Sequence, residues 1–510
     1  MLLESLGAFT NLETLYMGWS DLKGTRFTQG SNLINLRELD LNSSWVNGNF
    51  LQSLETLPLL ETLSMQGCGP SGIIPVSQSI CKLKHLQKLD ISYNNLSSNL
   101  PLCLANLTSL RQLDLSSNHF TGNISSSPLE GLTNLEYLSY LNPRFQLEKL
   151  VLSSGGYGGA FPKFLYHQHD LQFIDLSHIQ MSEGFPYWLF QNNTKLEKLY
   201  LINNSLSGPL KLPIHSHMNL SVLDISNNFF QGFITPEIGT YLPKLSHLNM
   251  SGNGFNGSIP SSFGNMSLLE RLDLSNNRLS GTIPEDLTIG CVSLQELILS
   301  NNSLQGQIFS ETSNLRVLYE LQLDGNQFTG SIPHSLSNIS FLRVLDLSHN
   351  NLYGRIPRWL GNMYFLRVLD LSMNNISGSL PSNFCPSNIQ EIYLSRNGLQ
   401  GSLEDAFYGC SELIVLDLGH NHMTGSIPSW IGKFSRLSYL ILGHNYIDGK
   451  SQMLSYISGI DLSCNHLTGQ IPIEIGYLNE IHVLNLSHNS LTGKIPASFS
   501  NLRQIESLDL

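Results

Sequence analysis

Apolar residues recur along the chain at a fixed interval. The pattern LxxLxLxxNxLxGxIP fits 21 successive copies, and a further copy starts at Ile505 and stops at Leu510. In the second half of the chain, the Asn of this pattern returns every 23 to 25 residues. Regular repetition of this length predicts a solenoid, in which each copy forms one turn and contacts only its neighbours.

The xLxL segment of each copy predicts a short strand. Apolar and polar residues alternate in it, so Leu272 and Leu274 are expected to face the interior and Asp273 to face solvent. A single copy cannot bury its apolar side, but parallel stacking places each Leu on its counterparts in the adjacent turns. We therefore expect an α/β-type repeat solenoid with a parallel β-sheet on its concave face.

An Asn follows the strand in most copies, at the point where the chain must turn inward. Its amide can donate to and accept from backbone groups of adjacent turns, which cost about 1 to 3 kcal/mol each when buried without a partner. We expect these residues to form a structural Asn ladder. In the second half of the chain its members are Asn204, Asn228, Asn253, Asn277, Asn302, Asn326, Asn350, Asn374, Asn397, Asn421 and Asn445.

Charged residues make up only 13% of the chain, about half of the ~25% that is usual for a soluble domain. Asn, Ser, Gly and Thr supply the polar surface instead, and they create 14 Asn-x-Ser/Thr acceptors. A secreted glycoprotein accounts for that density. The glycosylation candidates include Asn95, Asn106, Asn123, Asn192, Asn219, Asn256, Asn265, Asn338 and Asn375.

The formal net charge of −12 gives no basic stripe for a phosphate backbone, which argues against nucleic acid as a partner. The sequence contains no nucleophile elbow, HExxH motif, Gly-rich phosphate loop or CxxC pair. Its Ser, His and Asp residues are spread along the repeats, whereas catalysis needs them to converge. We therefore expect a binding protein that is not an enzyme and has no catalytic residue, metal or cofactor.

Seven cysteines are too few for a disulfide scaffold, and their odd number leaves at least one without a partner in this chain. Cys81 and Cys103 lie 22 residues apart at nearly the same phase of neighbouring repeats, so they are the candidates for a disulfide. The alternative is that they are small apolar fillers of the core.

The second half of the repeat, as in Phe255-Asn-Gly257-Ser-Ile259-Pro260, resembles the plant-specific leucine-rich repeat. That resemblance implies a right-handed superhelix with an extra sheet along its flank. Longer stretches are similar to plant receptor-like proteins, the kinase-less relatives of leucine-rich-repeat receptor kinases. They include Tyr166-His-Gln-His-Asp170-Leu, Leu223-Asp-Ile-Ser-Asn227-Asn and Ser458-Gly-Ile-Asp-Leu-Ser463.

The repeat spacing breaks at two places. About half of a repeat is missing near residues 140–146, and 20 residues replace the usual 24 between Asn445 and Asn465. In the receptor-like proteins a non-repeat island precedes the segment that resembles Ser458–Ser463. The resemblance thus implies leucine-rich repeats over 1–448, a junction over 449–456 in place of the island, and repeats over 457–510 that are truncated at the C-terminus.

The chain shows no signal peptide and no apolar run of about 18 residues that would span a membrane. Members of the resembled family have both, together with a cysteine-paired N-terminal cap. The resemblance therefore implies an ectodomain fragment or the product of a shortened gene. The full-length protein would hold these repeats on the extracellular face of the plasma membrane.

The outward position between the two strand leucines forms a column along the concave face. Tyr200, Ile298, Tyr393 and Ile441 place large apolar groups there, and exposed apolar clusters mark interaction sites. More often the position holds an aspartate that we expect to be merely solvated, as at Asp224, Asp273, Asp346, Asp370, Asp417 and Asp461.

Several unusual residues fall on consecutive strands just before the junction. In island-bearing members of the wider receptor class, the island and the nearby concave strands hold a peptide. We hypothesise a ligand-binding patch here, called the concave patch, formed by Tyr393, Arg396, Ile414, His420, Tyr439, Ile441 and His444. The alternative is scattered variation on an unused face.

Histidine immediately precedes the ladder Asn in four copies, at His349, His420, His444 and His488. Because histidine titrates near pH 6.5, pH-dependent binding in a mildly acidic cell wall is a further hypothesis.

The resemblance implies a receptor that binds an extracellular peptide, protein or glycan and signals through a co-receptor or adaptor kinase, in defence or development. Two alternatives stay open. One is a secreted inhibitor of pathogen wall-degrading enzymes, similar to the polygalacturonase-inhibiting proteins, although those have roughly half as many repeats. The other is a truncated product without function.

Overall fold

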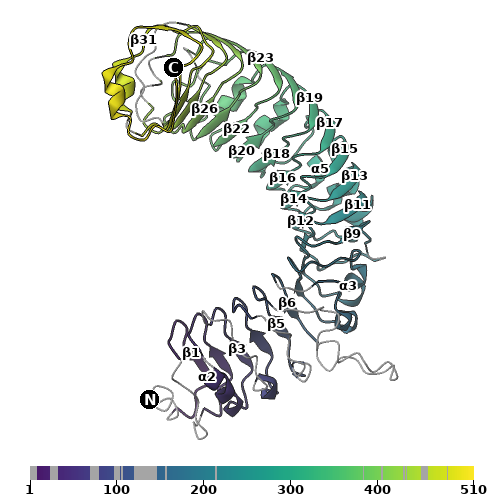
Figure 1. Ribbon diagram of the computed structural model, residues 1–510. Helices are drawn as coiled ribbons and strands as arrows, with labels where there is room; N and C mark the ends of the chain where they lie inside the picture. Colours follow the sequence, from purple (N-terminus) through teal and green to yellow (C-terminus); the bar gives the residue numbers. More distant parts are fainter. Residues whose placement is uncertain are drawn as a thin grey trace. The chain divides into compact units, whose positions relative to one another are not determined.

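The protein was analysed as a computed structural model. It describes residues 9–22, 33–46, 48–68, 80–96, 104, 107–119, 146–154, 158–212, 215–382, 384–403, 406–428, 431, 434–448, 458–478 and 480–510. The chain divides into two compact units, Met1–Phe255 and Asn256–Leu510. Both are built from stacked turns (Figure 1), and each is described by itself.

Every described turn contributes one three-residue strand to a parallel sheet, and 21 such strands are present. In unit 1 they are β1 (Thr14–Tyr16), β2 (Glu38–Asp40), β3 (Thr62–Ser64), β4 (Lys88–Asp90), β5 (Gln112–Asp114), β6 (Lys149–Val151), β7 (Phe173–Asp175), β8 (Lys198–Tyr200), β10 (Val222–Asp224) and β12 (His247–Asn249). In unit 2 they are β14 (Arg271–Asp273), β16 (Glu296–Ile298), β18 (Glu320–Gln322), β20 (Val344–Asp346), β22 (Val368–Asp370), β24 (Glu391–Tyr393), β26 (Val415–Asp417), β28 (Tyr439–Ile441), β30 (Gly459–Asp461), β32 (Val483–Asn485) and β34 (Ser507–Asp509). The predicted solenoid with a parallel sheet is confirmed.

A second parallel sheet runs along the flank of the turns, as the plant-type repeat implies. Gly in the LxG motif has a positive φ, for example +89° at Gly354, a conformation that other residues adopt only with strain. The strands in unit 1 are β9 (Ser207–Gly208) and β11 (Phe229–Phe233). Those that follow are β13 (Gly254–Ser258), β15 (Arg278–Gly281), β17 (Ser303–Gly306), β19 (Gln327–Gly330), β21 (Asn351–Gly354), β23 (Asn375–Ser379), β25 (Gly398–Gly401), β27 (His422–Gly425) and β29 (Tyr446–Ile447), with a separate pair β31 (Thr468–Gln470) and β33 (Ser490–Thr492).

Short helices complete the turns. Half of the described helices begin directly after the Pro of the IP motif, since its fixed φ suits the entry to a helix and its missing N–H needs no partner there. None of the helices in the described ranges is long and apolar enough to cross a membrane. The α-helices are α2 (Gly48–Ser53), α3 (Tyr187–Asn192), α4 (Ile238–Tyr241) and α5 (Glu285–Gly290), and the 3-10 helices are η1 (Leu54–Thr56), η2 (Ile80–Lys82), η6 (Lys163–His167), η7 (Ser261–Asn265), η8 (His334–Asn338), η9 (Arg358–Asn362), η11 (Ile473–Tyr477) and η12 (Ala497–Asn501).

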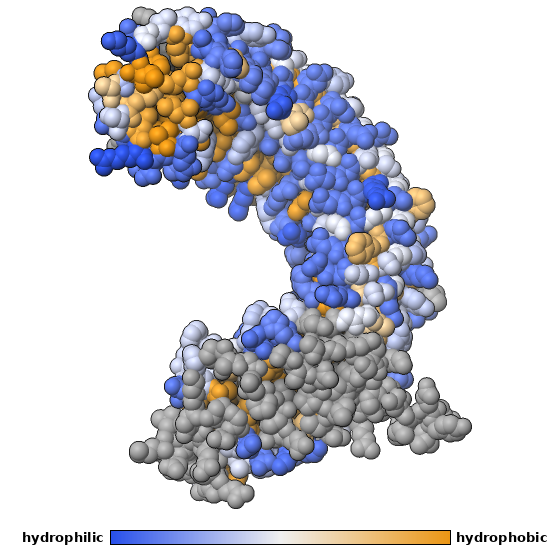
Figure 2. All heavy atoms as spheres, in the orientation of Figure 1, coloured by the Kyte–Doolittle hydropathy of each residue, from blue (hydrophilic) through white to orange (hydrophobic). Residues whose placement is uncertain are grey.

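The core of each unit is a continuous stack of leucines. The central residue of each strand pairs in register with that of the next, as in Leu345 with Leu369, and both side chains are fully buried. On the end face of unit 2, apolar side chains gather on the surface (Figure 2), where Leu508 is 47% exposed. A stack of this kind buries each apolar face only against the adjacent turn.

The ladder Asn residues hold neighbouring turns together. The Asn350 amide donates to the carbonyl oxygens of Leu347 and Ser348 in its own turn and to that of Leu323 in the preceding turn, at 3.0 to 3.2 Å. Its Oδ1 accepts the backbone N–H of Phe328 at 2.9 Å. Ten of the eleven predicted positions repeat this pattern of donation within the turn and between turns, and at Asn277 the two bonds within its own turn are present.

The concave aspartates have a structural role that the sequence did not indicate. Oδ1 of Asp273 accepts the backbone N–H and the hydroxyl of Ser275 at 3.0 and 2.7 Å, and the Asp273 residue is only 8% exposed. The expectation that these residues are merely solvated is therefore wrong. The same bond to the backbone N–H two residues later forms at Asp224, Asp346, Asp370, Asp417 and Asp461.

The strand ladder continues across both breaks in the repeat spacing. Strand β28 pairs directly with β30, and Ile447 donates its N–H to Asn465 on the far side of the junction. Strand β5 pairs directly with β6, so no strand stands between them. The junction 449–456 and most of the segment 140–146 lie outside the described residues.

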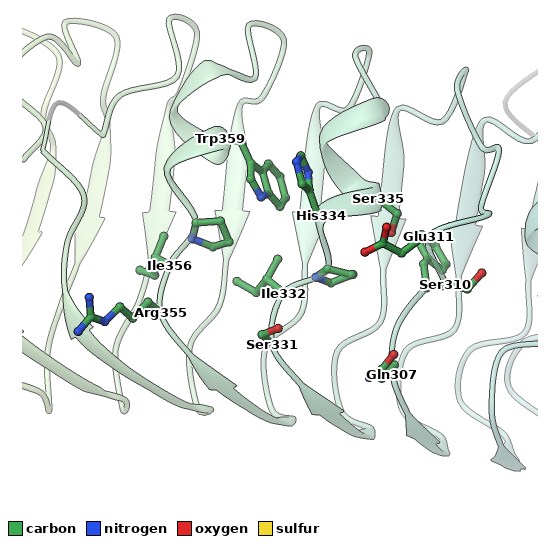
Figure 3. Close-up of a pocket in the computed structure, with 13 residues that line it drawn as sticks. Gln307, Ser310, Glu311, Ser331, Ile332, His334, Ser335, Arg355, Ile356 and Trp359 are labelled. Atoms are coloured by element: carbon green, nitrogen blue, oxygen red, sulfur yellow. The ribbon is translucent and has the colours of Figure 1, made fainter.

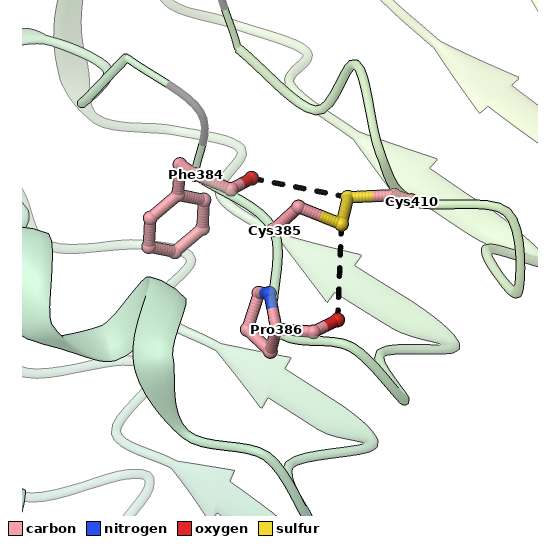
Figure 4. Close-up of a disulfide and its surroundings, with 4 residues drawn as sticks. All are labelled: Phe384, Cys385, Pro386 and Cys410. Atoms are coloured by element: carbon pink, nitrogen blue, oxygen red, sulfur yellow. Dashed lines mark hydrogen bonds between the residues drawn. A yellow bond between two sulfur atoms is a disulfide. The ribbon is translucent and has the colours of Figure 1, made fainter.

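A disulfide joins two neighbouring turns of unit 2 (Figure 4). Cys385 and Cys410 are 25 residues apart, and their Cα atoms are 5.5 Å apart. The sequence analysis did not select this pair, although a separation of one repeat is the signal that would have found it. Cys81 is also disulfide-bonded, while its predicted partner Cys103 lies outside the described residues. Cys68, Cys291 and Cys464 are free.

Candidate functional site

The concave patch extends over three consecutive strands of unit 2. Tyr393, at the end of β24, is in register with Asp417 on β26, which is in register with Ile441 on β28. The two apolar side chains therefore belong to one column and flank a carboxylate. All three side chains are partly exposed.

Tyr393 is fixed by a neighbour that the sequence analysis missed. Its hydroxyl donates to Oε2 of Glu391 at 2.9 Å, since the two side chains lie on the same face of β24. Burial and the hydrogen bond to Glu391 raise the pKa of Tyr393 to about 12. The phenol is thus neutral at physiological pH, and its ring offers an apolar surface beside the charged Glu391.

Tyr439 lies in a parallel column formed by the first residue of each strand, two residues before the column of Tyr393 and Ile441. It is in register with Gly459 on β30, and its side chain is 48% exposed. A Cβ atom at Gly459 would lie 2.7 Å from Cδ1 of Tyr439, so the ring rests directly over this glycine. Sequence analysis missed Gly459, although glycine in the middle of a strand often marks a close approach.

Arg396, His420 and His444 form the third column, at the end of the strands. Each has a positive φ, between +54° and +58°, and each donates its backbone N–H to the next turn. The rings of His420 and His444 are stacked, with centroids 4.1 Å apart. All three side chains are exposed, so the column presents a guanidinium next to two imidazoles.

Ile414 stands apart from the other members of the concave patch. It immediately precedes β26, and its backbone carbonyl accepts the N–H groups of Ser438 and Tyr439. Its side chain is half-buried at the edge of the sheet. The structure therefore groups six of the seven predicted residues in three columns and places Ile414 beside them.

The four histidines do not form a continuous column. Met373 and Arg396 separate His349 from His420, and Cys464 separates His444 from His488. Burial, the adjacent His444 and Arg396 lower the pKa of His420. This shift reduces the protonation of His420 in a mildly acidic medium, which weakens the hypothesis of pH-dependent binding.

Most of the described glycosylation candidates are accessible. Asn192 is partly buried, and its amide donates to the carbonyl of Tyr166 at 2.9 Å. Asn106 and Asn123 lie outside the described residues. The exposed candidates are Asn95, Asn219, Asn256, Asn265, Asn338 and Asn375.

The potential metal-binding and reactive groups are dispersed. Within the described ranges, no three His, Cys, Asp or Glu side chains come together in a way that would hold a metal ion. Burial raises the pKa of the free thiols of Cys68 and Cys291 to about 11 and about 12. Both thiols are therefore protonated at physiological pH, which makes them poor nucleophiles.

Comparison with known proteins identifies the repeat family. The leucine-rich repeat model matches residues 74–120, 259–304, 316–376, 387–447 and 455–510, which together exceed half of the chain. Cuscuta receptor 1 of Solanum lycopersicum is 35% identical over 237 residues, or 39% of this chain and 21% of that protein. Receptor-like protein 1 of Arabidopsis thaliana is 41% identical over 204 residues, which are 32% of this chain and 19% of that protein. The aligned segments thus span about a fifth of these relatives.

Solved structures agree with the fold. The Arabidopsis receptor kinase HAESA, in complex with the peptide hormone IDA and the co-receptor SERK1, superposes with a TM-score of 0.83 at 29% identity, over 99% of this chain and 83% of that one. The plant peptide hormone receptor RGFR1 in complex with RGF2 superposes with a TM-score of 0.82 at 28% identity, over 98% of this chain and 82% of that one. The chain therefore belongs to the leucine-rich repeat family, and its relatives are plant receptor-like proteins and receptor ectodomains.

Proposed function

We propose that the chain is the extracellular ligand-binding region of a cell-surface receptor-like protein in plants, and that it signals in defence or development through a partner kinase. The observation that carries this proposal is the concave patch, which exposes aromatic and aliphatic side chains that the fold does not need. The solved relatives in complex with peptide hormones support a peptide ligand.

The chemistry of the concave patch suits an extended peptide. Tyr393 and Ile441 offer apolar contacts along one column, and Tyr439 offers a second aromatic face. Arg396 provides a cation for a carboxylate, while Glu391 provides an anion for a basic side chain. Binding energy at such surfaces concentrates in a few aromatic and Arg residues, so these are the expected energetic centre.

The test is a pull-down from apoplastic peptide extract by the chain produced in a plant secretory host. Bound peptides are identified by mass spectrometry, and the synthetic peptides are then titrated against the variants Tyr393→Ala and Tyr439→Ala. Each variant is expected to weaken binding by about tenfold or more. Tyr353→Ala is the control, because Tyr353 is an exposed tyrosine on the flank strand β21, outside the concave patch.

Unchanged affinity in both patch variants would contradict this assignment of the site. Failure to capture any peptide, combined with inhibition of a purified fungal polygalacturonase, would instead favour the secreted inhibitor. The partner kinase is tested separately, by co-precipitation of kinases with the full-length membrane protein with and without the peptide.

A further inference from the structure

A groove of about 530 Å³ opens on the flank of unit 2, away from the concave strands. Three successive turns line it, with the segments that follow β17, β19 and β21 and the starts of η8 and η9 (Figure 3). It involves none of the residues of the concave patch, so it is a candidate for a second, independent site.

The floor of the groove is apolar. Ile332 and Ile356 occupy equivalent positions in two of the turns, and in the third turn Phe309 stands where these two have a proline. The three residues are 4%, 3% and 4% exposed, in that order. Their packing is set by the repeat, and the prolines that follow two of them keep the backbone rigid. The floor is therefore preformed and does not need a ligand to order it.

Two aromatic rings rise from adjacent turns at the edge of this floor. The rings of His334 and Trp359 are nearly parallel, with an interplanar angle of 9° and centroids 6.2 Å apart. Nδ1 of His334 lies 2.7 Å from Oγ of Ser337, which fixes the imidazole. Figure 3 shows the two rings side by side, between the starts of the two helices.

One polar atom in the groove wall lacks a partner. Ser335 is only 7% exposed, and its Oγ makes no hydrogen bond to any described residue. A buried hydroxyl without a partner is costly, so each such atom in a native protein calls for an explanation, such as an ordered water, an ion or a ligand. Ser335 lines the groove, so a ligand there can supply the missing bond once the side chain rotates to bring the covered Oγ to the surface.

The charges of the groove balance. Arg355 lies at one end and Glu311 at the other, and the amide of Gln307 and the hydroxyls of Ser310 and Ser331 lie along the wall (Figure 3). A neutral ligand rich in hydroxyl groups can donate to the carboxylate and accept from the guanidinium. Because Arg355 and Glu311 offset each other, a strongly anionic ligand gains no net electrostatic attraction from the groove.

We propose that this groove binds a neutral saccharide chain. The C–H bonds on one face of a sugar ring pack on an aromatic ring such as Trp359, while its hydroxyls reach Ser335, Arg355 and Glu311. A peptide is less suited, because β19 is already paired with both β17 and β21 and offers no free strand edge for its backbone.

The experiment uses the secreted chain after endoglycosidase treatment, so that its own glycans do not compete. Cellohexaose and a high-mannose N-glycan are the two neutral probes, and they distinguish a wall polysaccharide from a protein-linked glycan. A hexameric oligogalacturonide and a neutral hexapeptide are the comparison probes. Saturation-transfer NMR detects contact, and isothermal titration gives the affinity.

At least one neutral probe is expected to bind. Trp359→Ala should weaken it about tenfold or more through loss of the stacking surface, and Ser335→Ala by a few fold through loss of one hydrogen bond. Tyr353→Ala is the matched control, because Tyr353 is an exposed aromatic residue on β21 that does not line the groove. Ser335→Ala removes a single atom, so it keeps the test valid if Trp359→Ala fails to fold.

Three results would overturn the proposal. They are no binding of either neutral probe at millimolar concentration, tighter binding of the oligogalacturonide or the hexapeptide, and unchanged affinity in both groove variants. Because the concave patch is probed with peptides and with other variants, its failure and that of the groove are distinguishable.

Discussion

Replacing Asn350 by alanine tests the Asn ladder directly. The wild-type side chain makes four hydrogen bonds, three as a donor to carbonyl oxygens and one as an acceptor from Phe328 N–H. Asn350 is 8% exposed and Phe328 is fully buried, so water cannot readily replace the lost partners. The substitution should therefore weaken the packing between the turn of Asn350 and the preceding turn, which contains Leu323 and Phe328.

The expected loss of stability follows from those four hydrogen bonds. A buried N–H without an acceptor costs about 1 to 3 kcal/mol. Carbonyl oxygens tolerate under-satisfaction better, since they carry two lone pairs, and Ser348 O also accepts the N–H of Gly325. We therefore expect Asn350→Ala to lower the free energy of unfolding by roughly 2 to 4 kcal/mol.

Hydrogen exchange by mass spectrometry is the assay, because a repeat array need not unfold in a single step. Protection should fall most in peptides that contain Phe328. Asn351→Ala is the control, since Asn351 is the adjacent, exposed residue on β21 and undergoes the same chemical change. Its effect should stay within about 0.5 kcal/mol. Equal exchange in the two variants would refute the role assigned to the ladder.

Three further predictions concern other parts of unit 2. Gly459→Ala should displace the Tyr439 ring, because the new Cβ would lie 2.7 Å from Cδ1 of Tyr439. The variant should weaken peptide binding without changing saccharide binding to the flank groove, and a crystal structure of the variant with Tyr439 in its original position would contradict this. The double variant Cys385→Ser/Cys410→Ser opens a loop with a sequence separation of 25 and should lower stability by about 2 to 4 kcal/mol, measured by urea unfolding, whereas an unchanged midpoint would argue against the disulfide. Burial raises the pKa of Asp346 from its ordinary value of 3.8 to about 6, so the folded state binds this proton more tightly and stability should fall as the pH rises from about 4 to 6. Asp346→Asn should flatten that slope in thermal unfolding, and an identical slope would count against the shift.

The sequence by itself determined the period of the solenoid. A Leu pair and an Asn at a nearly constant interval admit one arrangement, in which equivalent residues of successive turns stack. This is why the strands, the buried leucines and the hydrogen bonds of Asn350 lie where the pattern indicates. The family resemblance added the flank sheet, which the strand pattern does not contain.

Only the tertiary structure decided which side chains meet between turns. The disulfide between Cys385 and Cys410, the packing of Tyr439 on Gly459 and the unpaired hydroxyl of Ser335 all depend on contacts over about one repeat. Repeat lengths vary, so counting residues fixes the phase of a position but not the direction of its side chain or the distance to its neighbour. The direction of a side chain and its distance to a neighbour are set by backbone dihedrals and packing in three dimensions. These two properties place some residues in the concave patch and others in the flank groove.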